Sequence, residues 1–220
     1  MLISVHIPQC AGITFNHLLE EHFGARLLLD YADRPLAADY RWRMWKQRWL
    51  PFRDPRPRLG QIDCVHGHFT ADKYDFLDAS SRHITWLRDP LQRVAGHYHS
   101  WKRLPDLRNR DCRQLVAQNL SLEDFAALPR MRNVMTRFLA GKQPHHFFFM
   151  GLVEDLPQSL ARFTRLTGIA TDTTLALNRN DEGEEGYEIT EGVRARIENL
   201  NRHDREIYET TRKLVGSVNA

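Results

Sequence analysis

Strand-like and helix-like segments alternate along this chain of 220 residues, and that alternation most restricts how it can fold. Apolar runs of strand length occur at residues 2–6, 25–31, 61–66, 83–87 and 147–153. Helical patterns occur at residues 14–23, from 90, from 121, at 156–167 and at 190–215, the last as one long helix or two short ones. This order predicts an α/β fold with parallel strands joined by helical crossovers. We expect a single domain over residues 1–220.

The charge and the cysteine content of the chain limit which kinds of partner and site it can have. The chain has 31 basic and 28 acidic residues, and its net charge of +3 is too small to predict a nucleic-acid partner. The basic residues comprise 26 Arg and 5 Lys. Arginine suits the binding of phosphate or sulfate, although a GC-rich genome produces the same bias. Cys10, Cys64 and Cys112 fit neither a disulfide framework nor a CxxC zinc site, so we expect free thiols in a reducing compartment.

No secretory signal is recognisable at the N-terminus, and no apolar run approaches the roughly 18 residues of a membrane span. We therefore expect a soluble, cytoplasmic protein without a membrane partner.

The segment His6-Ile-Pro-Gln-Cys-Ala-Gly-Ile-Thr-Phe15 lies between the first predicted strand and the first predicted helix. Nucleotide-binding α/β proteins place a phosphate loop there, because amides at a helix N-terminus and the helix dipole both favour an anion. Gly12 allows a close approach to the backbone, and Thr14 adds a hydroxyl donor. The segment lacks the lysine of a Walker A loop. A plain strand-to-helix turn remains the alternative.

Several segments, in order, resemble one family. The loop at 6–15, the segment Val65-His-Gly-His-Phe69 and the segment Trp86-Leu-Arg-Asp-Pro-Leu-Gln-Arg-Val-Ala-Gly-His-Tyr98 are similar to motifs of sulfotransferases of the heparan sulfate 2-O-sulfotransferase type. Residues 133–141, 150–154 and 203–209 are similar to segments of the family's short bacterial members. Each motif alone is weak, but the ordered set spans nearly the whole chain.

The resemblance implies a P-loop-like three-layer fold with a central parallel sheet flanked by helices. It also implies a PAPS-dependent O-sulfotransferase, which moves a sulfuryl group from 3′-phosphoadenosine 5′-phosphosulfate to a hydroxyl of a carbohydrate or other small acceptor, with no metal required. The implied catalytic residues are His68 as general base and His66 as an orienting or acceptor-contacting group. The implied donor-binding residues are Pro8, Gln9, Cys10, Ala11, Gly12, Ile13, Thr14, Arg88, Gly96 and Arg179.

Three positions depart from the family's pattern. Gln9 stands where the family has a lysine, Ile13 where it has a threonine, and Gly96 where it has a serine. Without the lysine, no cation of the loop stabilises the negative charge that develops on the leaving phosphate, and a transferase loses much of its rate when such a contact is missing. Lys73, Arg43 and Lys102 are candidate replacements. An alternative is therefore a non-catalytic or altered nucleotide- or anion-binding module of the same fold. A nucleotide kinase is a third hypothesis, which the missing Walker lysine opposes.

Two further features leave alternatives open. Arg93 either reinforces the anion site or pairs with Asp89. Residues 41–49 place Trp42, Trp45 and Trp49 on one helix face, typical of a packed amphipathic helix but also suited to stacking on a sugar acceptor. Single-stranded nucleic acid could use the same face, but nothing else in the chain supports that partner.

His66 and His68 supply at most two zinc ligands, and no carboxylate or cysteine has convincing partner spacing. We therefore predict no metal site.

Overall fold

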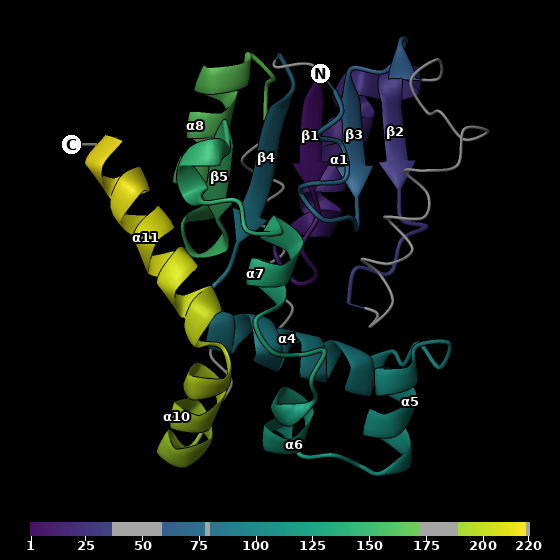
Figure 1. The fold of residues 1–220 in the computed structure, drawn as a ribbon, viewed down its shortest axis with the longest axis vertical. Coiled ribbons are helices and arrows are strands. Elements are labelled where there is room, and N and C mark those ends of the chain that lie inside the picture. Colours follow the sequence, from purple (N-terminus) through teal and green to yellow (C-terminus); the bar gives the residue numbers. More distant parts are fainter. Residues whose placement is uncertain (37–58, 78–79, 172–188, 219–220) are drawn as a thin grey trace.

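The computed structural model describes residues 1–36, 59–77, 80–171 and 189–218, which form a central parallel sheet with helices around it (Figure 1). The five strands are β1 (Leu2–Val5), β2 (Leu27–Asp30), β3 (Cys64–Gly67), β4 (Arg82–Leu87) and β5 (Phe149–Leu152). They lie in the order β2-β3-β1-β4-β5, and each neighbouring pair is parallel. The predicted α/β fold with a central parallel sheet flanked by helices is confirmed.

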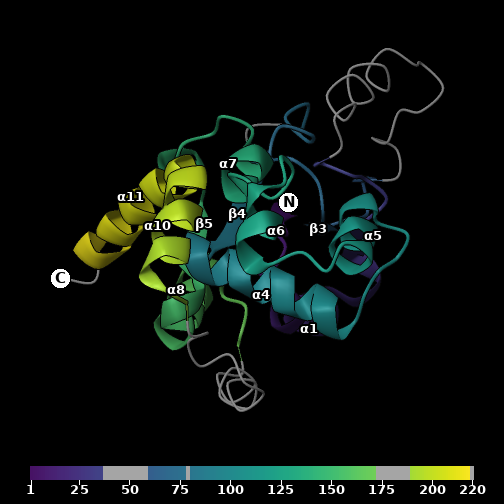
Figure 2. The same ribbon diagram turned by 90° about the horizontal axis from the view of Figure 1, so that it is seen from below.

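The described helices lie on both faces of the sheet and across one end of it. They are α1 (Gly12–Phe23), α4 (Pro90–Arg103), α5 (Arg110–Ala117), α6 (Leu122–Ala127), α7 (Val134–Leu139), α8 (Leu156–Thr167), α10 (Glu191–Leu200) and α11 (Arg202–Val218), with short 3-10 turns at Gly24–Arg26, Pro144–His146 and Val153–Asp155. Figure 2 shows α1 and α8 on one face and α7 and α11 on the other. None of the described helices is long and apolar enough to cross a membrane.

The main apolar core fills the space between the sheet and its helices. Phe15 of α1 packs edge-on against Trp86 of β4, with ring centroids 5.2 Å apart, and against Phe163 of α8 at 5.1 Å. Because both faces of the sheet are covered at its centre, β1, β3, β4 and β5 are buried at their central residues, as Ile3 and Ile84 illustrate. The edge strand β2 is only partly buried, and Leu29 is exposed. A second apolar cluster joins α4, α5, α6 and α10 below the sheet.

Several local signals have the predicted outcome. Ser121 and Asp124 form the capping box that starts α6, and Gly168 ends α8 in the left-handed conformation at φ 75°. The long C-terminal helical pattern divides into two helices at Asn201. Helices α5 and α7 were not predicted. The predicted helix with three tryptophans at residues 41–49 lies outside the described residues.

The carboxyl ends of the strands point toward α4, which crosses beneath them (Figure 1). The loop after β1, the histidines at the end of β3 and Arg88 directly after β4 therefore meet at one edge of the sheet. This edge is where open α/β sheets bind ligands.

Candidate functional site

The loop between β1 and α1 has a strained backbone. Gln9 and Ala11 both adopt positive φ, at 69° and 55°, although neither is glycine. Left-handed residues of this kind cost about 1–3 kcal/mol and occur often at functional sites. Ala11 is the N-cap of α1, and no side chain caps the helix there. The loop thus presents amides of the first helical turn in a geometry suited to an anion.

Gly12 begins α1 and has the His6 ring directly against it. A Cβ built on Gly12 would lie 1.5 Å from His6 Nε2, so only glycine fits beneath this imidazole. The sequence predicted that an anion would approach the Gly12 backbone, whereas in this structure the His6 ring occupies the space beside Gly12. The side chains of Ile13 and Thr14 lie outside the described part of the structure.

Arg88, Gln9 and Gly96 come from three separate segments and meet beside the loop. Arg88 is buried, at 6% exposure, and its Nη1 donates a hydrogen bond to the Gln9 carbonyl at 3.4 Å. A Cβ on Gly96 would lie 3.2 Å from both Arg88 Nη1 and Gln9 Oε1. The glycine inside α4 thus leaves room for these two side chains. Three of the residues predicted to bind the donor are in mutual contact.

Pro8 and Cys10 complete the described part of the loop. The Cys10 thiol is 1% exposed and donates to the Pro8 carbonyl at 3.8 Å. Burial raises the pKa of Cys10 to about 12, which keeps the thiol protonated and unreactive. The three cysteines are free thiols, as predicted, and all three are buried.

Arg93 lies on α4 and is fully buried. Its Nη2 donates to the Met131 carbonyl at 3.1 Å, while Nε and Nη1 have no partner among the described residues. Burial lowers the pKa of this guanidinium. In the described structure Arg93 does not pair with Asp89. The Asp89 carboxylate instead accepts a hydrogen bond from Arg205 Nη1 at 2.7 Å.

Four aromatic side chains gather where β1, β2 and β3 end. The parallel register places Ser4 beside His66, and Ser4 Oγ lies 2.8 Å from His66 Nδ1. The His6 ring stacks on His66 at 5.2 Å and lies 4.5 Å from His68. Tyr31 completes the group, with its hydroxyl 2.8 Å from His6 Nδ1 and its ring 4.9 Å from His68. His6, Tyr31, His66 and His68 are called the histidine group below.

Burial keeps the imidazoles of the histidine group uncharged. It lowers the pKa of His66 and of His68 to about 4. Burial, and then the neighbouring His68 and His66 rings, lowers the pKa of His6 to about 2. Nε2 of both His66 and His68 is buried without a hydrogen-bond partner in the described structure. An uncharged imidazole with an unpartnered ring nitrogen can accept a proton, but a pKa of about 4 makes it a weaker base than one tuned close to neutrality.

The described residues contain no group of three or more His, Cys, Asp or Glu side chains arranged to hold a metal ion. His66 and His68 are instead grouped with His6 and Tyr31 by ring contacts.

Two of the proposed substitutes for the missing lysine bind elsewhere. Lys73 Nζ donates to Asp30 and to Asp33, each at 2.5 Å. Lys102 Nζ donates to Asn119 Oδ1 at 2.7 Å, near the far end of α4. Arg43 lies outside the described residues, as does Arg179.

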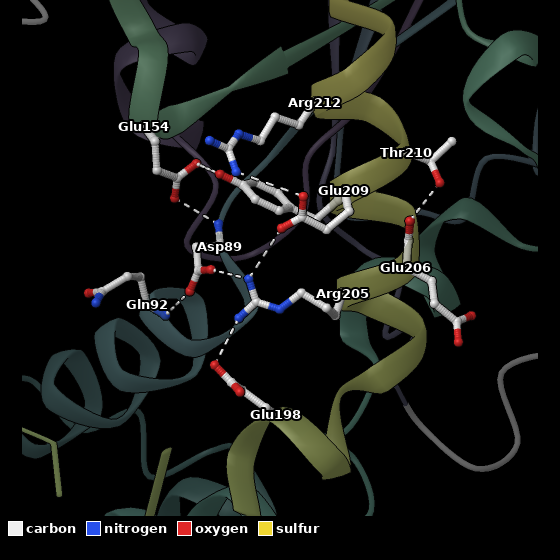
Figure 3. A network of polar contacts seen from close by, with 10 residues as sticks. Asp89, Gln92, Glu154, Glu198, Arg205, Glu206, Glu209, Thr210 and Arg212 are labelled. Atoms are coloured by element: carbon white, nitrogen blue, oxygen red, sulfur yellow. Dashed lines mark hydrogen bonds and ion pairs between the residues drawn. The ribbon is translucent and has the colours of Figure 1, made fainter. Parts of the chain in front are cut away.

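A polar network around Asp89, the residue after Arg88, was not predicted from the sequence (Figure 3). It connects the start of α4, the turn after β5 and helices α10 and α11 through the side chains of Asp89, Glu154, Glu198, Arg205 and Tyr208. The only signal in the sequence was that residues 150–154 and 203–209 belong to motifs without an assigned role. The contacts of Asp89 with Glu154 and Arg205, and of Tyr208 with Glu154, join residues more than 50 positions apart, which no local pattern reveals.

Helix α11 is anchored to α7 by separate contacts. The Asp204 carboxylate accepts hydrogen bonds from the backbone amides of Met135 and Thr136 at 3.1 and 2.8 Å. In return, Asn133 Oδ1 accepts from the amide of His203 at 3.1 Å. The two helix starts thus satisfy each other's unpaired amides.

No protein-family model matches the chain, and no curated protein sequence is similar to it. Among solved structures, a mouse sulfotransferase, SULT7A1, complexed with PAP is similar at a TM-score of 0.46 and 13% identity, over 80% of this chain. The match covers 63% of the mouse chain, so this chain spans under two thirds of it. A sulfotransferase domain from the curacin biosynthetic pathway is similar at a TM-score of 0.39 and 12% identity, over 90% of this chain and 82% of that domain.

Proposed function

We propose that this protein is a sulfotransferase that transfers a sulfuryl group from PAPS to a hydroxyl of a carbohydrate or other small acceptor. The observation that carries the proposal is the meeting of Gln9, Arg88 and Gly96 at the start of α1, next to the uncharged histidine group. The ordered motifs noted in the sequence supply the chemical interpretation of this meeting.

The residues present fit the nucleotide end of such a donor. Arg88 is a buried guanidinium beside the uncapped N-terminus of α1, and both features favour a phosphate. In the proposal, Arg88 and the bare backbone at Gly96 hold the 3′-phosphate, and the loop at 8–14 holds the phosphosulfate. The bound donor supplies the sulfuryl group and a phosphate leaving group.

His68 is the proposed general base. Its Nε2 is unpartnered, and its lowered pKa leaves it unprotonated at neutral pH. It takes the proton from the acceptor hydroxyl as that oxygen attacks sulfur. His66 Nδ1 faces the Ser4 hydroxyl, which fixes the orientation of its ring, so we assign it an orienting role.

One observation favours a second candidate, a nucleotide- or anion-binding module without transfer activity. Gln9 carries no charge, and Lys73 is already bound by two carboxylates. The leaving group then lacks the cation that most lowers the barrier to transfer.

Calorimetry with adenosine 3′,5′-bisphosphate at low salt tests the binding common to both candidates. We expect the wild-type protein to bind and Arg88→Met to bind far more weakly. The matched control is Arg108→Met, which removes an exposed arginine that pairs with Asp106 at 2.9 Å, outside the network around Asp89. Absence of wild-type binding would refute both candidates.

A transfer assay with labelled PAPS and a panel of hydroxyl acceptors separates the two candidates. Turnover by the wild type supports the sulfotransferase. Binding without turnover, together with transfer by Gln9→Lys, supports the module.

A further inference from the structure

Every polar group of Asp89 has a partner, and Asp89 directly follows Arg88 (Figure 3). Its amide donates to Glu154 Oε1 at 2.7 Å. One carboxylate oxygen accepts from the amide of Gln92 at 3.1 Å and so caps α4. The other accepts from Arg205 Nη1 at 2.7 Å. These hydrogen bonds to Glu154, Gln92 and Arg205 together fix the peptide unit between Arg88 and Asp89.

Helix α11 supplies the outer part of this arrangement. The Tyr208 hydroxyl donates to Glu154 Oε2 at 2.9 Å, which orients the carboxylate that holds the Asp89 amide. Arg205 Nη2 also donates to Glu198 Oε1 at 3.2 Å. Tyr208 is 6% exposed, and burial, followed by the Glu154 charge, raises its pKa, so the phenol keeps its proton. Tyr208 is thus a permanent donor at neutral pH.

The amide of Asp89 shares its planar peptide unit with the carbonyl of Arg88. Fixing that unit limits the backbone rotation that aims the Arg88 side chain. At the other end of the side chain, Nη1 binds the Gln9 carbonyl. The backbone of Arg88 is therefore fixed by contacts that reach α11, and its guanidinium is fixed by the loop between β1 and α1.

From these contacts we propose that Tyr208 and Arg205 are positioning residues for Arg88, acting through Glu154 and Asp89. This inference rests on the proposed function, in which Arg88 holds the 3′-phosphate. The two side chains reach Arg88 through other residues, so their effect is specific to the part of the ligand that Arg88 contacts.

A purely structural role predicts a different pattern. Asp204 anchors α11 to α7 independently, so losing one hydroxyl from Tyr208 leaves the helix in place. A general loss of protein stability weakens the binding of every ligand alike. A loss of Arg88 positioning weakens the binding only of ligands that carry a 3′-phosphate.

The test compares dissociation constants for adenosine 3′,5′-bisphosphate and adenosine 5′-monophosphate by calorimetry. In Tyr208→Phe we expect the preference for the bisphosphate to fall about fivefold, because one hydrogen bond worth about 1 kcal/mol is lost. The matched control is Tyr98→Phe. Its hydroxyl donates to the Leu120 carbonyl at 3.1 Å, away from Asp89, and its preference should equal that of the wild type.

Arg205→Gln provides a second variant, and we expect a fall of at least the same size. Arg205→Lys keeps a cation near Asp89 and should restore part of the preference. If Tyr208→Phe does not fold, as judged by circular dichroism, the two Arg205 variants decide the question alone.

An unchanged preference in folded Tyr208→Phe and Arg205→Gln would refute the inference while leaving the proposed function intact. If Arg88→Met shows the same preference as the wild type, Arg88 does not contact the 3′-phosphate. Both the inference and that part of the proposed function then fail.

Discussion

The anion side and the base side of the candidate site lie at the ends of the same strands but use opposite electrostatics. On the anion side, which comprises Gln9, Arg88 and Gly96, Arg88 is a buried guanidinium. The next residue, Asp89, contacts Glu154 and pairs with Arg205 of α11. On the base side, the histidine group is uncharged and held by hydroxyl partners and ring stacking. Fixed positive charge favours the binding of a polyanion, whereas an imidazole accepts a proton only in its uncharged form. The proposed function assigns both tasks to one edge of the sheet.

The largest effect is expected on the base side. His68→Ala removes the proposed proton acceptor and should lower kcat by about 10²- to 10⁴-fold, because that is the usual contribution of a general base. The dissociation constant for adenosine 3′,5′-bisphosphate should stay within a factor of two or so, since the anion side is untouched. Steady-state kinetics and calorimetry on the same preparation measure both. Equal losses in turnover and binding would contradict the division into two sides.

The next effect is expected on the anion side. Arg88→Met removes a charge-assisted contact worth about 1.5–3 kcal/mol, which corresponds to a loss of roughly 10- to 150-fold in bisphosphate affinity. Calorimetry of the variant beside Arg108→Met, an exposed arginine paired with Asp106, measures this loss. A variant that binds as tightly as the wild type would show that Arg88 is only structural.

A smaller effect is expected where the two sides touch. In Gly12→Ala the new methyl group displaces the His6 ring, and we expect a loss of about 1–3 kcal/mol in unfolding free energy. Gly192→Ala in α10 is the matched control. Its Cβ points into open space, so helix propensity should make it neutral or slightly stabilising.

The double variant Gly12→Ala with His6→Ala removes the obstructing ring. It should recover part of the stability relative to Gly12→Ala, as measured by urea denaturation. Strict additivity of the two losses would show that His6 does not lie against Gly12 in solution.

The smallest effect is a pH dependence of stability. The folded-state pKa of His66 is lowered by burial to about 4, from an ordinary value near 6.5. Above pH 6.5 both folded and unfolded states are neutral at this residue. Between pH 6.5 and 4 only the unfolded state takes up the proton, so stability falls as the pH falls.

This residue contributes at most about 1.4 kcal/mol per pH unit in that range. His66→Gln should therefore have a shallower loss of unfolding free energy between pH 6.5 and 5 than the wild type. Urea titrations at each pH measure both slopes. Parallel slopes would mean that His66 is not buried in its neutral form.

The local features of the fold were predictable because they depend on neighbouring residues. The capping box at Ser121 and the helix end at Gly168 follow from side-chain hydrogen bonding and backbone freedom within one turn. The strand at 25–31 was predicted too long, since residues 24–26 form a 3-10 turn before β2. The short helix α7 was missed because its N-terminal amides are satisfied by Asp204, almost 70 residues later.

By itself, the sequence determined the order of the strands and of the longer helices along the chain, the loop after the first strand and the residue types available for anion binding. These follow from apolar periodicity and from the backbone preferences of single residues. Only the tertiary structure decided that His6 lies against Gly12, that Lys73 is bound by two carboxylates and that Arg205 rather than Arg93 pairs with Asp89. Charged and aromatic side chains take whichever partners the packing brings within a few ångströms, and that proximity arises only when distant segments fold together.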